Sequence, residues 1–274
     1  MGAGEDSSNP ERLTRALARV LGEGAVAALA TVISAPQSVG AKILIEDGTH
    51  ARAGTTGDAA FDEAIAGHAA AFLASRAEAR TVRVEEFAPA LEAWRGARVL
   101  FERVAPEPHV VVCGAGHVGA ALARLAQSIG YRVTLIDDRA EFVARARFPE
   151  EGIALVAASD WTGPVRETVG TGRGVAVAVV TRGHNEDEEC MRAVLAARPD
   201  YVGMIGSKRR TNIVLARLRE SGFAEDALRE VRAPIGLDLG AETPEEIAVA
   251  IAAELVTLRR RGVAEAGAWS PPRA

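Results

Sequence analysis

The stretch from His109 to Arg139, HVVVCGAGHVGAALARLAQSIGYRVTLIDDR, limits what this chain can fold into more than any other stretch. It opens with a short apolar run rich in β-branched valine, which predicts a buried strand over 109–113. A glycine-rich segment follows directly, and apolar residues then recur at helical spacing over 117–129. A second apolar run over 132–136 ends in two aspartates. Strand, glycine turn, helix, strand and acid in this order are the dinucleotide-binding fingerprint of a Rossmann-type unit.

Each glycine of this segment has an expected task. Gly114 permits the tight turn, Gly116 lets the backbone approach a pyrophosphate, and Gly119 lets the helix pack closely on the strand. The helix that begins near His117 offers unpaired N–H groups and a partial positive charge to a phosphate. Alternatively, the glycines only shape a turn in a fold that serves another purpose.

The acidic end of the second strand suggests which nucleotide would bind. Asp137, with Asp138 beside it, lies about 20 residues after the glycines, where a carboxylate accepts a hydrogen bond from a ribose 2′-OH and favours NAD(H). Arg139 leaves NADP(H) open, because an arginine nearby can hold a 2′-phosphate. We count both aspartates among the candidate cofactor-binding residues.

Composition excludes several classes of protein. A hydrophobic content of 48% and a charged content of 25% are ordinary for a soluble globular protein. The net charge of −5, with no basic patch interleaved with aromatic residues, argues against a nucleic-acid partner. Cys113 and Cys190 form no CxxC pair, so neither a disulfide framework nor a metal site is predicted. No apolar run has the length of a signal peptide or membrane span, so we expect a cytoplasmic protein with no membrane partner.

Two prolines within 105–108 mark a hinge between two predicted domains, and a loose tail is expected at 263–274. The first domain, 1–105, is expected to be a smaller mixed α/β domain. Its helices are predicted from Pro10 and over 58–75, and its strands over 25–33, 41–45, 81–84 and 98–104.

The second predicted domain, 109–262, alternates strands and helices, which indicates a doubly wound parallel sheet. We expect strands over 109–113, 132–136, 153–157, 174–181 and 201–205, and helices over 117–129, 140–146, 162–169, 185–197 and 208–221. A last long helix begins near Thr243, with Pro244 first and Glu246 third in a capping box.

Ligands of open parallel sheets bind at the carboxyl ends of the strands, so the loops there are the candidate sites. After the strand over 174–181 come Arg182, His184 and Asp187. The histidine and aspartate, three apart at a helix start, could bind a metal, move a proton or contact a polar head group. Alternatively, the acidic residues only cap the helix and His184 is an ordinary loop residue.

The next loop, after 201–205, carries Gly206, Ser207 and Lys208, followed by two arginines. A glycine, a hydroxyl and cations at a helix start suit an anion such as phosphate. The alternative is a solvated basic run. The apolar loop 233–244 either folds over the cleft or is a rigid connection, and Cys113 is either a small buried hydrophobe or a sulfur that contacts a ligand.

No nucleophile elbow, P-loop or HExxH motif is present, and we predict no catalytic residue. The fingerprint by itself leaves open a nicotinamide-binding oxidoreductase or redox sensor. It also leaves open an interaction protein with an empty cleft.

Several motifs together resemble one family. VVVCGAGHVG and VTLIDDR are followed in order by TRGHNEDE, YVGMIGSKRR and RAPIGLDLGAETPEEIAVAIAAEL. This pattern, over about residues 109–260, is similar to the XdhC/CoxI family, the xanthine dehydrogenase accessory proteins. The resemblance implies a Rossmann C-terminal domain, a smaller N-terminal domain and a homodimer.

The same resemblance implies a chaperone function. Such proteins bind molybdenum cofactor, protect it while its terminal sulfur ligand is installed, and pass it to the apo-enzyme of a molybdenum hydroxylase. A cysteine desulfurase and that hydroxylase are the implied partners. We therefore expect a cofactor-binding chaperone, with an NAD(P)-binding oxidoreductase or redox sensor as the alternative.

The N-terminal part departs from the family pattern in three stretches. The loop written Gly-Ser-x-Pro-Arg in the family keeps Pro36 but has Gln37 at the arginine position. The stretch Ser-x-Gly-Gly-Cys appears as 54–58, with Asp58 in place of cysteine, and the later Cys-Gly-Gly appears as 94–96, starting with Trp94. If those groups hold the cofactor in relatives, this chain either uses other groups or has lost the task.

Overall fold

A computed structural model describes residues 9–49, 51–75 and 77–261, and the chain forms two compact units, Met1–Pro106 and Glu107–Ala274. The N-terminal unit is built on an antiparallel sheet with the strand order β3-β2-β1-β5-β4. Its strands are β1 (Ala27–Ser34), β2 (Lys42–Glu46), β3 (Arg52–Gly54), β4 (Ala79–Arg83) and β5 (Arg98–Val104). Its helices are α1 (Asn9–Gly22), α2 (Ala59–Ala74) and α3 (Val84–Phe87), with a 3-10 turn at Glu92–Trp94.

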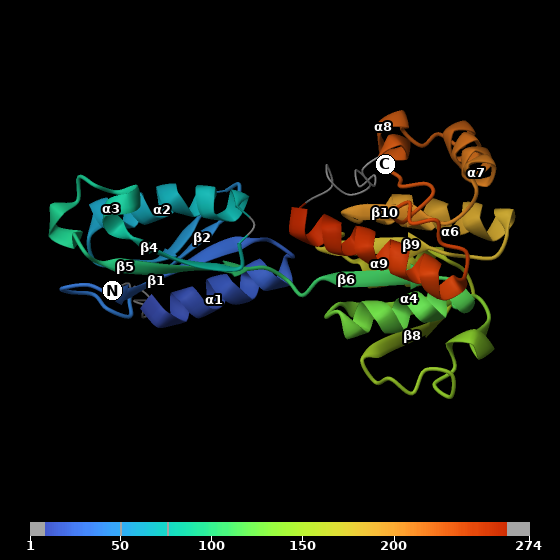
Figure 1. Ribbon diagram of the computed structural model, residues 1–274, viewed down its shortest axis with the longest axis horizontal. Helices are drawn as coiled ribbons and strands as arrows, with labels where there is room; N and C mark the ends of the chain where they lie inside the picture. The colour runs from blue at the N-terminus through green and yellow to red at the C-terminus, as the bar shows by residue number, and fades with distance from the viewer. Residues whose placement is uncertain (1–8, 50, 76, 262–274) are drawn as a thin grey trace, which may run out of the picture. The chain divides into compact units, whose positions relative to one another are not determined.

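The two longer helices of this unit cover opposite faces of its sheet (Figure 1). Phe61 and Phe72 of α2 are buried against the face that carries Phe101. On the other face, Val20 of α1 packs with Leu44. The predicted N-terminal elements are confirmed within a few residues, whereas the short β3 and α3 were not predicted.

The C-terminal unit contains a parallel sheet of five strands in the order β10-β9-β6-β7-β8. The strands are β6 (His109–Cys113), β7 (Arg132–Asp137), β8 (Ile153–Ala157), β9 (Val175–Val179) and β10 (Tyr201–Met204). The helices are α4 (His117–Ser128), α5 (Thr162–Val169), α6 (His184–Ala197), α7 (Lys208–Glu220), α8 (Glu225–Arg229) and α9 (Pro244–Arg261). The predicted doubly wound Rossmann sheet is confirmed, and its strand order reverses between β6 and β9.

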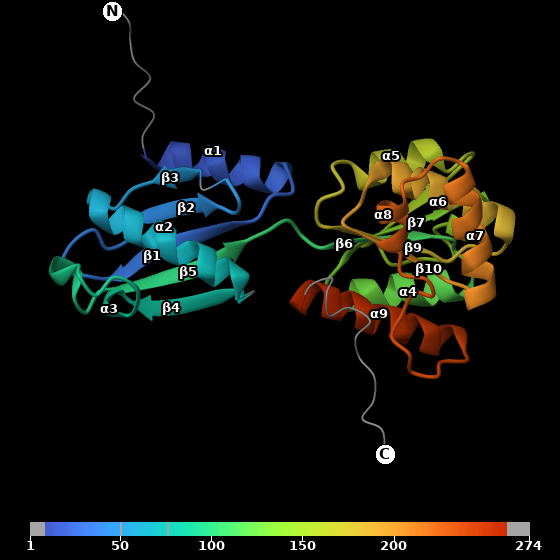
Figure 2. The same cartoon turned by 90° about the horizontal axis from the view of Figure 1, so that it is seen from above.

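Helices cover both faces of this sheet, which explains its continuous apolar strands (Figure 2). Val110 and Val112 of β6 face the layer of α4 and α9. Val111 and Cys113 face the layer of α5, α6 and α7. A fully buried valine stabilises a fold by about 1.5–3 kcal/mol, so both faces of this strand contribute to stability.

The predicted helix over 140–146 is wrong, since the structure has only a 3-10 turn at Ala140–Val143. Beyond it, the side chain of Arg145 donates to the carbonyl oxygens of Phe148, Glu150 and Ile153 at 2.9–3.2 Å. These carbonyl groups are bound by a guanidinium, and the segment takes an irregular path. The short helix α8 was also not predicted, and β9 ends two residues before the predicted strand does.

The last helix begins as predicted. Glu246 accepts a hydrogen bond from the backbone of Thr243 at 3.0 Å, and the Thr243 hydroxyl accepts from Glu246 N at 3.2 Å. Ile251 and Leu255 bury one face of α9. Although α9 is the longest helix in the described ranges, no helix there is long and apolar enough to cross a membrane.

Candidate functional site

The candidate site lies where the strand order reverses, at the carboxyl ends of β6 and its two neighbours. The glycine loop after β6 leaves the sheet between the loops after β7 and β9. Backbone hydrogen bonds tie these loops together: Gly114 N donates to Ile136 O at 2.7 Å, and Val180 N donates to Cys113 O at 2.8 Å. The backbone at this edge is therefore fixed by its neighbours on both sides.

The three glycines of the loop are constrained in different ways. Gly114 has φ +111°, and a Cβ there would lie 2.7 Å from Val180 O. A Cβ on Gly119 would lie 1.8 Å from Gly114 O, so α4 packs on the loop without space for a side chain. Gly116 has φ −67°, and no described atom lies within 4 Å of its Cβ position. The fold itself therefore requires two of the glycines, and Gly116 borders open space.

Two helices begin at this edge without a side-chain cap. Gly116 precedes α4 and Gly183 precedes α6, and no described side chain accepts a hydrogen bond from the first turn of either helix as its N-cap. By contrast, the hydroxyl of Ser207 accepts from Arg210 N at 3.3 Å and caps α7. Because the first N–H groups of a helix have no intrahelical acceptor, α4 and α6 together offer donors to an anion.

Asp137 is 1% exposed and is held by protein groups. Its carboxylate accepts from Ala115 N at 2.6 Å and from the Arg139 backbone and guanidinium at 2.8–2.9 Å. Burial by itself would raise the pKa of Asp137, but the hydrogen bonds from Arg139 and Ala115 outweigh it and hold the pKa below its ordinary value. The carboxylate thus links the end of β7 to the glycine loop.

Asp138 and Arg182 meet across the end of β6. The guanidinium donates to both carboxylate oxygens, at 2.8 and 3.0 Å. Arg182 also lies 3.5 Å from Glu186 in the first turn of α6. The structure therefore brings together two predicted residues that are 44 positions apart in the sequence.

Asp187, predicted to face the cleft or to cap α6, lies in the core and is 0% exposed. It accepts a hydrogen bond from the Thr181 hydroxyl and pairs with the Arg210 guanidinium at 2.6 Å. Arg210 belongs to the candidate anion site predicted after β10, but sequence reasoning missed its pairing with Asp187. Of His184 the structure describes only the backbone, which begins α6, and its side chain lies outside the described residues.

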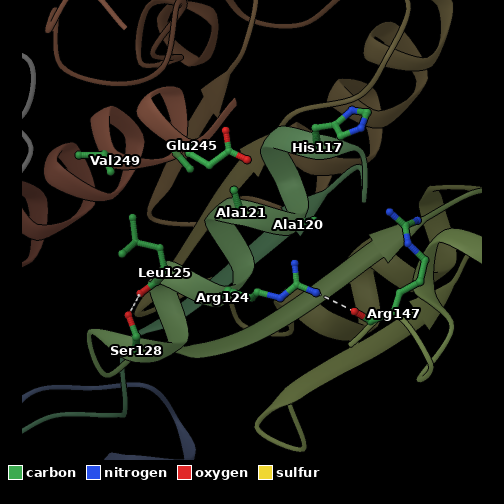
Figure 3. A pocket seen from close by; sticks show the side chains of 10 residues that line it. His117, Ala120, Ala121, Arg124, Leu125, Ser128, Arg147, Glu245 and Val249 are labelled. Carbon is green, nitrogen blue, oxygen red and sulfur yellow. Dashed lines mark hydrogen bonds between the residues drawn. The ribbon is translucent and has the colours of Figure 1, made fainter. Parts of the chain in front are cut away.

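The other predicted residues lie on exposed or half-buried positions around this edge. Gly206 has φ +146°, and Ser207 and Lys208 are exposed at the start of α7. His117, the first residue of α4, lines a groove of about 670 Å³ between α4 and α9, where Glu245 also lies (Figure 3). His117 thus lies beside the candidate site, at the start of α4, and lines the neighbouring groove.

Both cysteines of the chain are fully buried in the C-terminal unit. Burial raises the pKa of Cys190 well above its ordinary value, and the adjacent Cys113 thiol contributes to this shift. The interpretation of Cys113 as a small buried hydrophobe therefore fits the structure. Among the residues that the structure describes, no group of three His, Cys, Asp or Glu side chains is placed to hold a metal ion.

The three N-terminal stretches that depart from the family pattern form one corner of their unit. Trp94 Nε1 donates to Asp58 Oδ2 at 2.9 Å, so the two positions that lack the family's cysteines are in contact. The Ser38 hydroxyl, next to Gln37, donates to Thr56 O at 2.7 Å. Here a carboxylate and an indole stand where the family pattern has thiols, and the Gln37 amide stands where it has an arginine.

Comparison with known proteins agrees with this architecture. A family model described as the XdhC Rossmann domain matches residues 110–255. A solved structure of a xanthine dehydrogenase from Bacillus halodurans covers 95% of this chain and 70% of its own, with 22% identity and a TM-score of 0.65, which shows a shared fold.

Three curated relatives match parts of the chain. The uncharacterized protein YqeB of Escherichia coli is 32% identical over 152 residues, 56% of this chain and 27% of its own length. A probable xanthine dehydrogenase subunit from Bacillus subtilis is 28% identical over 163 residues, 60% of this chain and 46% of its own. The molybdenum cofactor insertion chaperone PaoD of Escherichia coli is 29% identical over 84 residues, 31% of this chain and 26% of its own. The matched region spans less than half the length of each relative.

Proposed function

The chain belongs to the XdhC family, and on that premise we propose that it binds molybdenum cofactor as cargo and delivers it to a molybdenum hydroxylase. Two relatives support this proposal by name, one as a molybdenum cofactor insertion chaperone and one as part of a probable xanthine dehydrogenase. The chain would then act as an accessory protein and not as the hydroxylase itself.

The observation that carries the proposal is the pair of uncapped helix starts at Gly116 and Gly183. The cofactor is a pterin with a phosphate, and the N-terminus of a helix stabilises a phosphate through its free N–H groups and partial positive charge. The open space at Gly116 supports close approach of the ligand to the backbone. Ser207 and Lys208, exposed at the start of α7, would add anion contacts from the neighbouring loop.

The positions of the cysteines limit how sulfur can reach the cargo. The chain has two cysteines, and both are fully buried. A thiol buried away from solvent is a poor sulfur carrier, because neither a desulfurase nor the cofactor can reach it. We therefore place sulfur transfer between a cysteine desulfurase and the bound cofactor directly, with this protein holding and shielding the cofactor.

The remaining partners follow from the same proposal. The protein would act in the cytoplasm as a homodimer. It would receive the cofactor, keep it while the desulfurase acts, and insert it into the apo-hydroxylase. Docking on the apo-enzyme would drive release.

A strain that lacks this chain tests the function. Its molybdenum hydroxylase is expected to accumulate with little sulfurated cofactor and low activity, and the wild-type gene should restore both. Cofactor content of the purified hydroxylase, measured beside its activity, separates failed insertion from poor expression. Full hydroxylase activity without the chain would contradict the proposal.

A nicotinamide-binding oxidoreductase or redox sensor is the second candidate, and the glycine loop with an acid at the end of β7 favours it. In this chain the acid, Asp137, already accepts hydrogen bonds from Ala115 and Arg139. A ribose would therefore compete with protein donors for the same carboxylate. Turnover of NAD(H) or NADP(H) by the pure protein would support this alternative.

A further inference from the structure

The Asp138–Arg182 bridge joins the two loops between which the glycine loop leaves the sheet. β7 and β9 both pair with β6, on opposite sides. Asp138 follows β7 directly, and Arg182 follows β9 by three residues. The bridge therefore spans the carboxyl end of β6, where a phosphate held by the start of α4 would lie.

The bridge is bidentate but open to water. Both guanidinium N–H groups lie at hydrogen-bond distance from the carboxylate, and the side chains are 45% and 30% exposed. Pairs exposed to this extent contribute little net stability, because water and salt screen them. The bridge can thus exchange partners at small cost to the fold.

The neighbouring guanidinium groups at this edge are bound to buried carboxylates. Arg139 holds Asp137, and Arg210 holds Asp187, both of which are at most 1% exposed. Removing a partner from a buried charge costs far more than opening an exposed pair. Arg139 also lies 3.8 Å from Asp138, beyond hydrogen-bond distance. Of these three arginines, Arg182 is the one whose hydrogen-bonded carboxylate is accessible to water.

Arg182 also lies in an acidic surrounding. Its hydrogen bonds with Asp138, and the charges of Asp138, Glu186 and Asp137, raise its pKa above the ordinary value. A guanidinium fork fits a phosphate as well as it fits a carboxylate, and both pairings can be bidentate. A phosphate at the glycine loop would therefore compete with Asp138 for the same donors.

On the basis of the proposed function, we propose that Arg182 is the side chain that recognises the phosphate of the ligand, and that Asp138 competes with it. Without ligand, Arg182 is held by Asp138 across the end of β6. When phosphate binds, the Arg182 guanidinium exchanges the Asp138 carboxylate for phosphate, and the Asp138 carboxylate is then solvated by water. Affinity for the phosphate is thereby set by the competition between the two anions.

Calorimetric titration of the full chain with inorganic pyrophosphate at low ionic strength tests this exchange. D138N should bind pyrophosphate ~3-fold or more tightly than the wild type, because an exposed ion pair no longer opposes binding. R182Q should bind at least ~10-fold more weakly, since a charge-assisted bidentate contact is lost. The gain from D138N should shrink in the D138N/R182Q double variant.

Glu225 provides the matched control. It makes a bidentate pair with Arg219 at 2.6 and 3.1 Å between α7 and α8, with similar exposure. E225Q changes the net charge by the same amount as D138N and should leave pyrophosphate binding unchanged. The exchange is overturned if wild type and D138N bind pyrophosphate with equal affinity. It is also overturned if D138N raises the affinity by the same factor with Arg182 present and with R182Q, or if no variant binds pyrophosphate.

The same variants separate this inference from the proposed function. If the wild type binds molybdenum cofactor but D138N and R182Q show no coupling, the exchange fails and the chaperone function stands. If the coupling appears with pyrophosphate but no variant binds molybdenum cofactor, the exchange stands and the chaperone function fails.

Discussion

At the scale of single residues, the glycines of the loop have different roles: one is required for packing, and another leaves space for a ligand. Gly119 cannot accept a Cβ without contact at 1.8 Å with Gly114 O, a backbone atom that is itself fixed. Gly116 can accept one, since open space surrounds its Cβ position and its φ of −67° suits any residue. Substitution by alanine should therefore lower the stability of the fold far more at Gly119 than at Gly116.

We expect G119A to lower the free energy of unfolding by roughly 2–4 kcal/mol, because the helix must move away from the loop. G116A should cost about 1 kcal/mol or less, the difference between glycine and alanine as an N-cap. Urea unfolding followed by circular dichroism measures both. Equal destabilisation of the two variants would show that Gly116 also has a packing role.

The buried aspartate Asp187 is expected to stabilise the edge through Arg210 and Thr181. D187N should lower the free energy of unfolding by roughly 3 kcal/mol, because it leaves the guanidinium without its buried counter-charge. D138N, which removes the same charge from an exposed pair, should change it by about 1 kcal/mol or less. Chemical denaturation of the two variants beside the wild type would decide, and a D187N protein as stable as D138N would contradict the assigned role.

His109, at the start of β6, predicts a pH dependence of stability. Burial, with a smaller effect from the charge of Arg132, lowers its pKa from 6.5 to about 4. Between these two values the unfolded chain binds more protons than the folded chain. The free energy of unfolding should therefore fall as the pH drops from about 6.5 to 4, by up to about 1.4 kcal/mol per pH unit. H109Q should weaken this slope relative to wild type, and parallel profiles of the two proteins would refute the assignment.

Local geometry at these residues was only partly predictable from the sequence. The tasks of Gly114 and Gly119 follow from the fingerprint, since strand, turn and helix fix their surroundings. The burial of Asp187 does not, because its partner Arg210 lies 23 positions away and comes near only when β9 and β10 pair. The Asp138–Arg182 bridge was missed for the same reason.

At the scale of elements, α9 shows how a cap can be tested. T243A should lower the free energy of unfolding by about 1 kcal/mol, because the Glu246 N–H loses its acceptor. Thr257 on the same helix donates to Ala253 O and caps nothing, so T257A should be close to neutral. Thermal unfolding of both variants would test the cap, and an unchanged T243A would contradict it.

Elements with a strong hydrophobic period were predictable, and irregular ones were not. The inner strands β6 and β9 are buried on both faces, so their apolar runs are continuous in the sequence. The segment after β7 misled the prediction, because its alternating alanines and arginines favour a helix by propensity. In the folded chain Arg145 binds carbonyl groups of the following loop, a tertiary contact that overrides local preference.

At the scale of the whole molecule, each unit buries its own core around its own sheet. The C-terminal unit provides the sheet edge at which two helices begin without a side-chain cap. The XdhC family model covers this same edge. In the N-terminal unit, the corner formed by Asp58, Trp94 and the loop at Ser38 has no thiol. The proposed function therefore depends on phosphate recognition by the C-terminal unit and does not require a cysteine of this chain.

One measurement tests this account most directly: calorimetric titration of the pure protein with molybdenum cofactor and, separately, with NAD(H). We predict that the wild type binds molybdenum cofactor, that NAD(H) gives little heat, and that G116A loses cofactor affinity while its fold remains intact. Tight binding of NAD(H) with no response to molybdenum cofactor would contradict the account and make the Gly116 edge a nicotinamide site.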